Sequence, residues 1–205
     1  MSVKDGLLKL WNEIKDCNAC PRKRKYIPWA FPERWGVKGF LGDGTVNISE
    51  LGKTIKIMFV SFRPSTVARS WGEFPDPKSS RSQKISFENA RFYYSCLKEY
   101  GFENAHLTDI IKCQKPVKAE VTPVELRNCV TKFLSKEIEI VKPDLIVTLG
   151  RETSIFMICI QAWLKTDIPQ LSLPHYAQRG SDGKKRFREA LKGLRDLLKG
   201  SKIGN

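Results

Sequence analysis

Cysteine is the residue type whose spacing in this chain most directly suggests chemistry. Cys17 and Cys20 form a CxxC pair, and Cys113 and Cys129 form a second, wider pair. Four thiolates meet the requirement of a [4Fe-4S] cluster, whereas ribbon-type zinc sites generally use two close CxxC pairs. The pattern therefore favours a [4Fe-4S] cluster held by these four residues, with zinc or no metal as the alternatives.

The start of the chain and the remaining cysteines bear on the cellular compartment in which the protein is expected. Residues 1–15 are amphipathic and mixed in charge, unlike a signal peptide, and no apolar run reaches the length of a membrane span. We therefore expect a cytoplasmic protein without a membrane partner. In a reducing compartment thiols serve metal binding or packing, and Cys96 and Cys159, which have apolar neighbours, are expected in the core.

His175 is the candidate for acid–base or hydrogen-bonding chemistry. It follows a short apolar run and Pro174, and the end of a strand is a reasonable place for a residue that faces a ligand. The alternative is a surface histidine or one with a structural role.

The elements that must position these residues follow from the apolar pattern. Short apolar runs predict strands at 55–61, 105–111, 145–149 and 170–173. Helical spacing predicts helices at 3–16, 85–100, 123–140 and 185–198 and after Gly150. Segments 21–52 and 65–82, which are rich in Pro, Gly and aromatic residues, are expected to be irregular. Alternating strands and helices predict an α/β fold with a mostly parallel sheet, covered on both faces, that binds ligands at the strand carboxyl ends.

The clearest helix start in the sequence is at Thr122. This residue is a good N-cap, Pro123 suits the first helical position, and Glu125 completes a capping box. The start of this helix therefore lies between the two cysteines of the wider pair.

The charge balance points to a polyanionic partner. The chain has 36 Lys and Arg against 22 Asp and Glu, a net charge of +14 over 205 residues. Such a surplus attracts nucleic acid in a salt-dependent way. A generally basic surface that serves solubility is the alternative, and charge alone does not separate DNA from RNA. The length suits one domain, 1–205.

The order of the motifs resembles the iron–sulfur branch, families 4 and 5, of the uracil-DNA glycosylase superfamily. The resemblance covers nearly the whole chain from Cys17 onward. Its motifs are LTDIIKCQKP (107–116), TPVELRNC (122–129), VKPDLIVTLGR (141–151) and LPHYA (173–177). It implies one domain with a central four-stranded, mostly parallel sheet flanked by helices. It also implies that the four cysteines are structural ligands of the cluster, and that DNA crosses the strand ends with one nucleotide flipped into a pocket.

The resemblance also assigns roles at the pocket. Cleavage of an N-glycosidic bond leaves negative charge on the departing base, so a donor near the base oxygen accelerates it. His175, at the position of the family's HP(S/A) motif, would be that donor. Phe74 is similar to the family's phenylalanine that stacks on the flipped base. The alternative interpretation is that Phe74 is a loop residue whose ring packs into the core.

The first motif departs from the family pattern. GEAPG is replaced by Ser61–Phe62–Arg63–Pro64–Ser65, so Phe62 stands where a glutamate helps to position water. The usual water-positioning carboxylate is therefore missing. Arg63 is a candidate for contact with phosphate or a base carbonyl, and Ser61, Phe62 and Arg63 together are expected to bind the substrate.

Two further departures affect the base and the DNA. Asp109 replaces the asparagine of the family's TNVVKC, and an ionised carboxylate only accepts hydrogen bonds, which disfavours plain uracil. Asp109 is expected to read an amino-bearing base, to act while protonated or to serve as general base, unless it only caps the following turn. Tyr176 replaces the proline of HP(S/A). With Arg179, Lys184 and Lys185 it is expected to contact DNA, the alternative being a solvated basic loop.

These observations together predict a DNA glycosylase of base excision repair. It would hydrolyse the N-glycosidic bond of a flipped uracil or other altered base in damaged or deaminated DNA, duplex or single-stranded, and act as a monomer. The alternative is a catalytically silent iron–sulfur DNA-binding protein of the same fold, and an RNA-binding or RNA-modifying protein is a third possibility.

Overall fold

The computed structural model describes residues 1–20, 27–28, 42–48, 52–63, 81–114, 120–176 and 182–200. Four parallel strands lie in the order β4–β3–β6–β7, with bounds β3 Lys53–Ser61, β4 His106–Asp109, β6 Leu145–Leu149 and β7 Gln170–Leu173. A fifth strand, β2 (Thr45–Ile48), pairs antiparallel with the first half of β3. The prediction of an α/β fold with four mostly parallel strands is confirmed, with β2 as an addition.

The parallel strands form because their sequences are continuous apolar runs. Every residue of β6 is buried, as are the last five residues of β3. Strands covered by helices on both faces need such runs, since neither face meets water. Both were predicted close to their observed bounds.

The expectation that all of 21–52 is irregular was wrong for the part that the structure describes. β2 lies within it, as does the short strand β1 (Ile27–Pro28), which pairs with β5 (Cys113–Gln114). In β2 the alternating Val46 and Ile48 face the core. Four alternating residues that follow a glycine-containing segment are too short a signal to distinguish a strand from a loop.

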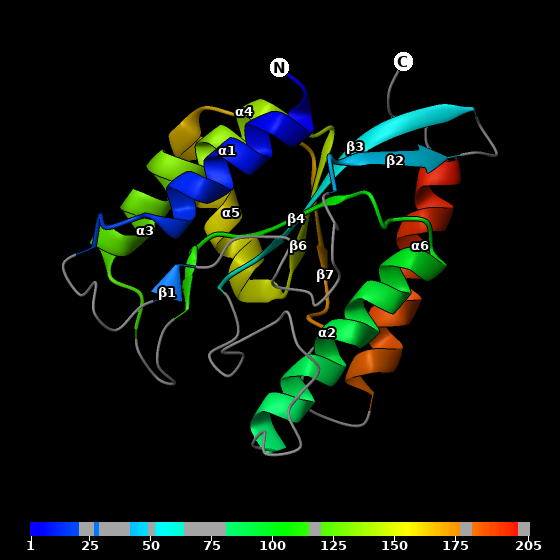
Figure 1. Ribbon diagram of the computed structural model, residues 1–205. Coiled ribbons are helices and arrows are strands. Elements are labelled where there is room, and N and C mark those ends of the chain that lie inside the picture. Colours follow the sequence, from blue (N-terminus) through cyan, green and yellow to red (C-terminus); the bar gives the residue numbers. More distant parts are fainter. Residues whose placement is uncertain are drawn as a thin grey trace.

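Helices cover both faces of the sheet (Figure 1). One layer contains α1 Val3–Lys15, α3 Pro123–Cys129, the π-helical turn η4 Val130–Leu134, α4 Ser135–Val141 and α5 Arg151–Leu164. α2 (Arg81–Glu99) and α6 (Gly183–Gly200) lie side by side on the other face. The crossovers from β3 to β4 and from β6 to β7 run in opposite directions along the sheet, so right-handed connections place α2 and α5 on opposite faces.

The capping box at Thr122 is confirmed. The Thr122 hydroxyl accepts a hydrogen bond from the Glu125 N–H (3.3 Å), and the Glu125 carboxylate accepts one from the Thr122 N–H (2.8 Å). The helix it starts continues as predicted to Val141, although η4 interrupts the α-helical pattern directly after Cys129. The cap therefore fixes where α3 begins and, one helix length later, where Cys129 lies.

The two C-terminal helices differ in how well their sequence predicted their burial. α6 buries Phe187, Leu191, Leu194 and Leu198, as predicted. On α5, Ile155 and Ile158 are 53% and 60% exposed and Cys159 is exposed, so the expectation that Cys159 lies in the core was wrong. The apolar residues of α5 lie on all sides of the helix. The sequence therefore gives no periodic signal for the side that packs on β6 and β7. No helix among the described residues is long and apolar enough to span a membrane.

Candidate functional site

The carboxyl ends of β3 and β4 bring Ser61 and Asp109 together. The two residues are partners in the strand register. Just beyond them, the Ile110 N–H donates to the Ser61 carbonyl (2.9 Å) and the Ile111 N–H to the Phe62 carbonyl (3.0 Å). The first motif and Asp109 therefore lie side by side at the level of the backbone.

The side chains at these ends differ in exposure. Asp109 and Ser61 are buried, with 2% and 5% of their surface exposed, whereas Phe62 and Arg63 are half-buried. The Phe62 ring packs on Phe156 of α5, with 4.9 Å between ring centroids. Where the resembling family has a carboxylate that positions water, this chain therefore has an apolar contact between β3 and α5.

His175 lies beyond the carboxyl end of β7. The Gly150 N–H donates to the Leu173 carbonyl (2.8 Å), which holds the end of β7 against the start of α5. Gly150 has φ +92°, which favours glycine, and a Cβ there would lie 3.5 Å from the Cβ of His175. The backbone at His175 therefore lies directly against the turn between β6 and α5.

The His175 imidazole is half-buried and belongs to an aromatic stack. It stacks on Tyr176, with ring centroids 4.5 Å apart and planes inclined by 22°. Tyr176 in turn stacks on Tyr93 of α2, at 4.5 Å and 9°. No sequence pattern indicates this contact, because Tyr176 and Tyr93 are far apart along the chain.

Asp109 and His175 lie on opposite sides of the β3 and β6 ends. Three inter-strand spacings separate β4 from β7, which corresponds to about 14 Å between the strands. The two residues therefore flank a stretch of the sheet edge that includes Ser61 and Gly150. In doubly wound sheets such an edge, where successive connections leave in opposite directions, is where ligands bind.

The four predicted ligand cysteines come from three places in the fold. Cys17 and Cys20 follow the end of α1, Cys113 lies in β5, and Cys129 ends α3. The Asn128 amide joins the end of α3 to the segment after α1, because its Nδ2 donates to the Ala19 carbonyl (3.0 Å) and lies 3.8 Å from the Cys20 Sγ.

The thiols influence one another electrostatically. Burial, together with the proximity of Cys129, Cys17 and Cys20, raises the pKa of Cys113 to about 12. Burial likewise raises the pKa of Cys129 to about 11, against the effect of the Lys112 N–H, which donates to its sulfur. The four sulfurs therefore share one region of the molecule.

The cysteines are not joined to one another. None of the six, all of which are described, forms a disulfide. Within the described ranges no three His, Cys, Asp or Glu side chains are arranged to hold a metal ion.

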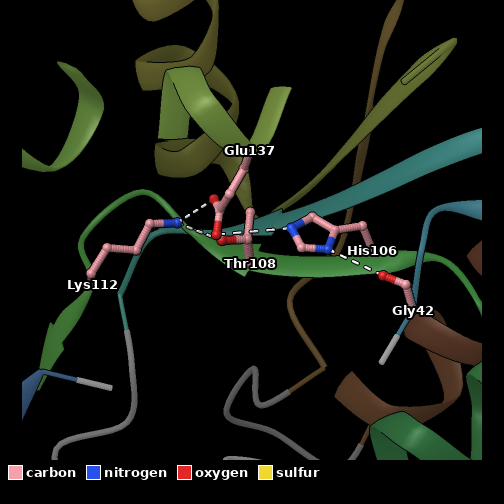
Figure 2. A network of polar contacts seen from close by, with 5 residues as sticks. All are labelled: Gly42, His106, Thr108, Lys112 and Glu137. Carbon is pink, nitrogen blue, oxygen red and sulfur yellow. Dashed lines mark hydrogen bonds and ion pairs between the residues drawn. The ribbon is translucent and has the colours of Figure 1, made fainter. Parts of the chain in front are cut away.

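A buried polar network lies between β4 and α4, and sequence analysis missed it (Figure 2). The Lys112 ammonium donates to the Glu137 carboxylate (2.5 Å) and to the Thr108 hydroxyl (2.5 Å), and Thr108 donates to Glu137 (2.8 Å). The His106 Nε2 lies 3.9 Å from the second carboxylate oxygen. All four side chains are at most 4% exposed.

The network is electrostatically balanced around Glu137. Burial disfavours the Glu137 carboxylate, but the Lys112 ammonium and His106 outweigh burial and lower its pKa to about 2. Thr108 directly precedes Asp109, and Lys112 directly precedes Cys113. The network therefore fixes the backbone between the strand-end site and the cysteine site.

The predicted DNA-contacting residues are placed in part. Lys184 and Lys185 lie at the start of α6, where the Lys184 ammonium is 5.3 Å from the centre of the Phe92 ring. Lys185 is 76% exposed and 3.9 Å from Glu189, and a surface pair of this kind is weak. Phe74 and Arg179 lie outside the described residues.

Comparison with known proteins identifies the family. The family model described as the uracil DNA glycosylase superfamily matches residues 48–195, which is more than half of the chain. A type-4 uracil-DNA glycosylase of Thermotoga maritima is 26% identical over 161 residues, or 77% of this chain and 69% of the relative.

Two further matches are shorter or more distant. A type-4 uracil-DNA glycosylase of Archaeoglobus fulgidus is 33% identical over 55 residues, 27% of each chain. The crystal structure of wild-type SMUG2 from Pedobacter heparinus covers 70% of this chain and 76% of its own, with a TM-score of 0.47 and 12% identity. By the family match over residues 48–195, the chain belongs to the uracil DNA glycosylase superfamily.

Proposed function

We propose that this protein is a DNA glycosylase that hydrolyses the N-glycosidic bond of an altered base flipped into the edge of the sheet. The observation that carries the proposal is the placement of Asp109 and His175 on either side of the β3 and β6 ends, within the region that matches the family. The net charge of +14 and the exposed Lys185 at the start of α6 suit a phosphate backbone.

The chemistry requires stabilisation of the departing base. As the glycosidic bond breaks, electrons move to the base, and a hydrogen bond from the His175 imidazole to a base oxygen stabilises that charge. Water attacks the sugar carbon. Because Phe62 packs on Phe156 and supplies no carboxylate, Asp109 is the residue that, among those described at this edge, offers a carboxylate for orienting water or reading the base.

Single-turnover cleavage tests the proposal. Oligonucleotides with uracil, hypoxanthine, xanthine or a mismatch are incubated with excess protein, and abasic sites are revealed by alkali. We expect cleavage of at least one of these substrates. Cleavage of none, with the DNA nevertheless bound, would instead support a catalytically silent DNA-binding protein, which the Phe62–Phe156 contact favours. Competition with RNA of the same sequence tests an RNA target.

Asp109→Asn is expected to change the base preference toward uracil. An asparagine amide donates to one uracil group and accepts from another, whereas an ionised aspartate only accepts. A site built to hydrogen-bond a group rejects analogues that leave it unpaired. Single-turnover rates on uracil and on the best wild-type substrate should therefore move in opposite directions, and a parallel loss on both would contradict a base-reading role.

We propose that Cys17, Cys20, Cys113 and Cys129 hold a [4Fe-4S] cluster, which supplies a structural crosslink and no step of the hydrolysis. Burial and the neighbouring thiols raise the pKa of Cys113 and Cys129, so a bound cation that stabilises their thiolates is favourable at this place. The Lys112 N–H that donates to the Cys129 sulfur is typical of the surroundings of a metal ligand. The wide spacing of the second pair favours iron over zinc.

Cys113→Ser is expected to abolish most of the iron content and the brown colour of the purified protein. Cys159→Ser is the matched control, because Cys159 is exposed on α5 and should leave both unchanged. Metal analysis and the visible spectrum measure the difference. Zinc in place of iron in the wild-type protein, or equal iron in both variants, would contradict the assignment.

A further inference from the structure

We propose that Tyr176 is a positioning residue for His175. Its ring, stacked between Tyr93 of the core and His175, restricts the orientation of the imidazole. The inference deepens the proposed function and rests on it for its catalytic part. The sequence favoured Tyr176 as a DNA contact, and the structure places its ring against other rings of the protein.

The stack begins in the core. Tyr93 is 1% exposed and meets Phe59 of β3 (ring centroids 6.5 Å apart, 78°) and Phe187 of α6 (5.5 Å, 60°). Phe59 also meets Phe102 at 5.8 Å. Tyr93 is therefore held by the sheet and by both helices of one layer.

Tyr176 connects this anchor to the half-buried His175. Its ring is nearly parallel to Tyr93 (9°) and within 22° of His175, with both centroids at 4.5 Å, and it meets Phe187 edge-on at 6.1 Å. Stacked aromatic pairs at such distances are attractive beyond their burial. A ring fixed by Tyr93 and Phe187 thus restricts the orientations of the imidazole next to it.

His175 needs such a support because it lies past the strand. The last register pair of β7 is Leu173 with Leu149, so the backbone ladder no longer holds the chain at position 175. The close passage over Gly150 fixes the Cβ of His175 but leaves the rotation of the ring about its own bonds to side-chain contacts. Base excision is slower when the orientation of the group that donates a hydrogen bond to the leaving base is not fixed in advance.

Nuclear magnetic resonance of the histidine rings tests the contact without DNA. The chain has two histidines, so the imidazole protons give two sets of signals, assigned with His175→Gln. In the wild-type protein the Tyr176 ring current shields the His175 protons. We expect Tyr176→Leu to move these signals downfield and Tyr176→Phe to leave them in place.

His106 is the internal control for folding. Its imidazole is 1% exposed, and its Nδ1 lies 3.3 Å from the Gly42 carbonyl, away from the stack. Its signals should stay unchanged in every Tyr176 variant, which separates a local loss of the stack from unfolding. His175 signals that do not move in a folded Tyr176→Leu protein would overturn the proposal.

Single-turnover kinetics test the catalytic part. Loss of one stacking partner is expected to lower the rate at saturating DNA roughly 2- to 10-fold in Tyr176→Leu, with little change in DNA affinity and with recovery in Tyr176→Phe. Weaker DNA binding with an unchanged saturating rate would mean that Tyr176 contacts DNA, and would overturn the positioning role. If the histidine signals respond as expected while the wild-type protein cleaves no substrate, the proposed function fails and the ring contact stands.

Discussion

Glu137→Gln is expected to lower the free energy of unfolding by about 3–5 kcal/mol, because it leaves the Lys112 ammonium buried without its counter-charge. Glutamine keeps the shape of the side chain, so the loss reports the charge and not a cavity. Lys112 is 4% exposed and donates to Glu137 and Thr108. Urea unfolding followed by circular dichroism measures the change.

Two further variants make the comparison sharp. Glu139→Gln removes a carboxylate from an exposed position of the same helix and should change stability by less than about 0.5 kcal/mol. Lys112→Met combined with Glu137→Leu replaces both charges by apolar groups and should regain most of the loss. A Glu137→Gln protein as stable as the Glu139→Gln control would show that the buried pair does not stabilise the fold.

The same pair predicts a pH dependence with a definite sign. The pKa of Glu137 is lowered in the folded protein to about 2, from an ordinary value of 4.5. A group with a depressed folded pKa stabilises the fold fully above its unfolded pKa, and this contribution is lost as the pH falls toward the folded pKa. The stability difference between wild type and Glu137→Gln should therefore shrink between about pH 4.5 and pH 2.

His175→Ala is expected to lower the single-turnover rate of base excision by about 10²- to 10³-fold, the usual cost of removing one donor to a developing anion. In the proposed function the half-buried imidazole, two residues beyond β7, acts on the base and not on the phosphate backbone. The affinity for DNA should therefore change little. Rates at saturating protein and binding isotherms on the same oligonucleotide separate the two effects.

A glutamine at position 175 provides the matched comparison. Its amide can still donate a hydrogen bond, so His175→Gln should retain part of the activity that His175→Ala loses. Equal rates for all three proteins on a substrate that the wild type cleaves would exclude His175 from the reaction. Equal and large losses of DNA binding would instead assign it to the DNA interface.

Much of the fold was predictable because its signals are local. The buried strands β3 and β6 are continuous apolar runs, and Thr122, Pro123 and Glu125 define a helix start whatever surrounds it. The signal was weak where burial depends on the neighbouring element. β2 has only four residues. Ile155 and Ile158 of α5 are apolar and therefore resemble core residues, but they are exposed, because β6 and β7 pack on another side of this helix.

The sequence by itself determined the residue types of the candidate site, and the tertiary structure decided their surroundings. That Asp109 meets Ser61 follows from the rule that parallel strands end at one edge. The Lys112–Glu137 pair and the stack of His175, Tyr176 and Tyr93 follow from no such rule. An ion pair or a ring contact depends on where two separately formed elements come to rest against each other, and that is set by how the whole core packs.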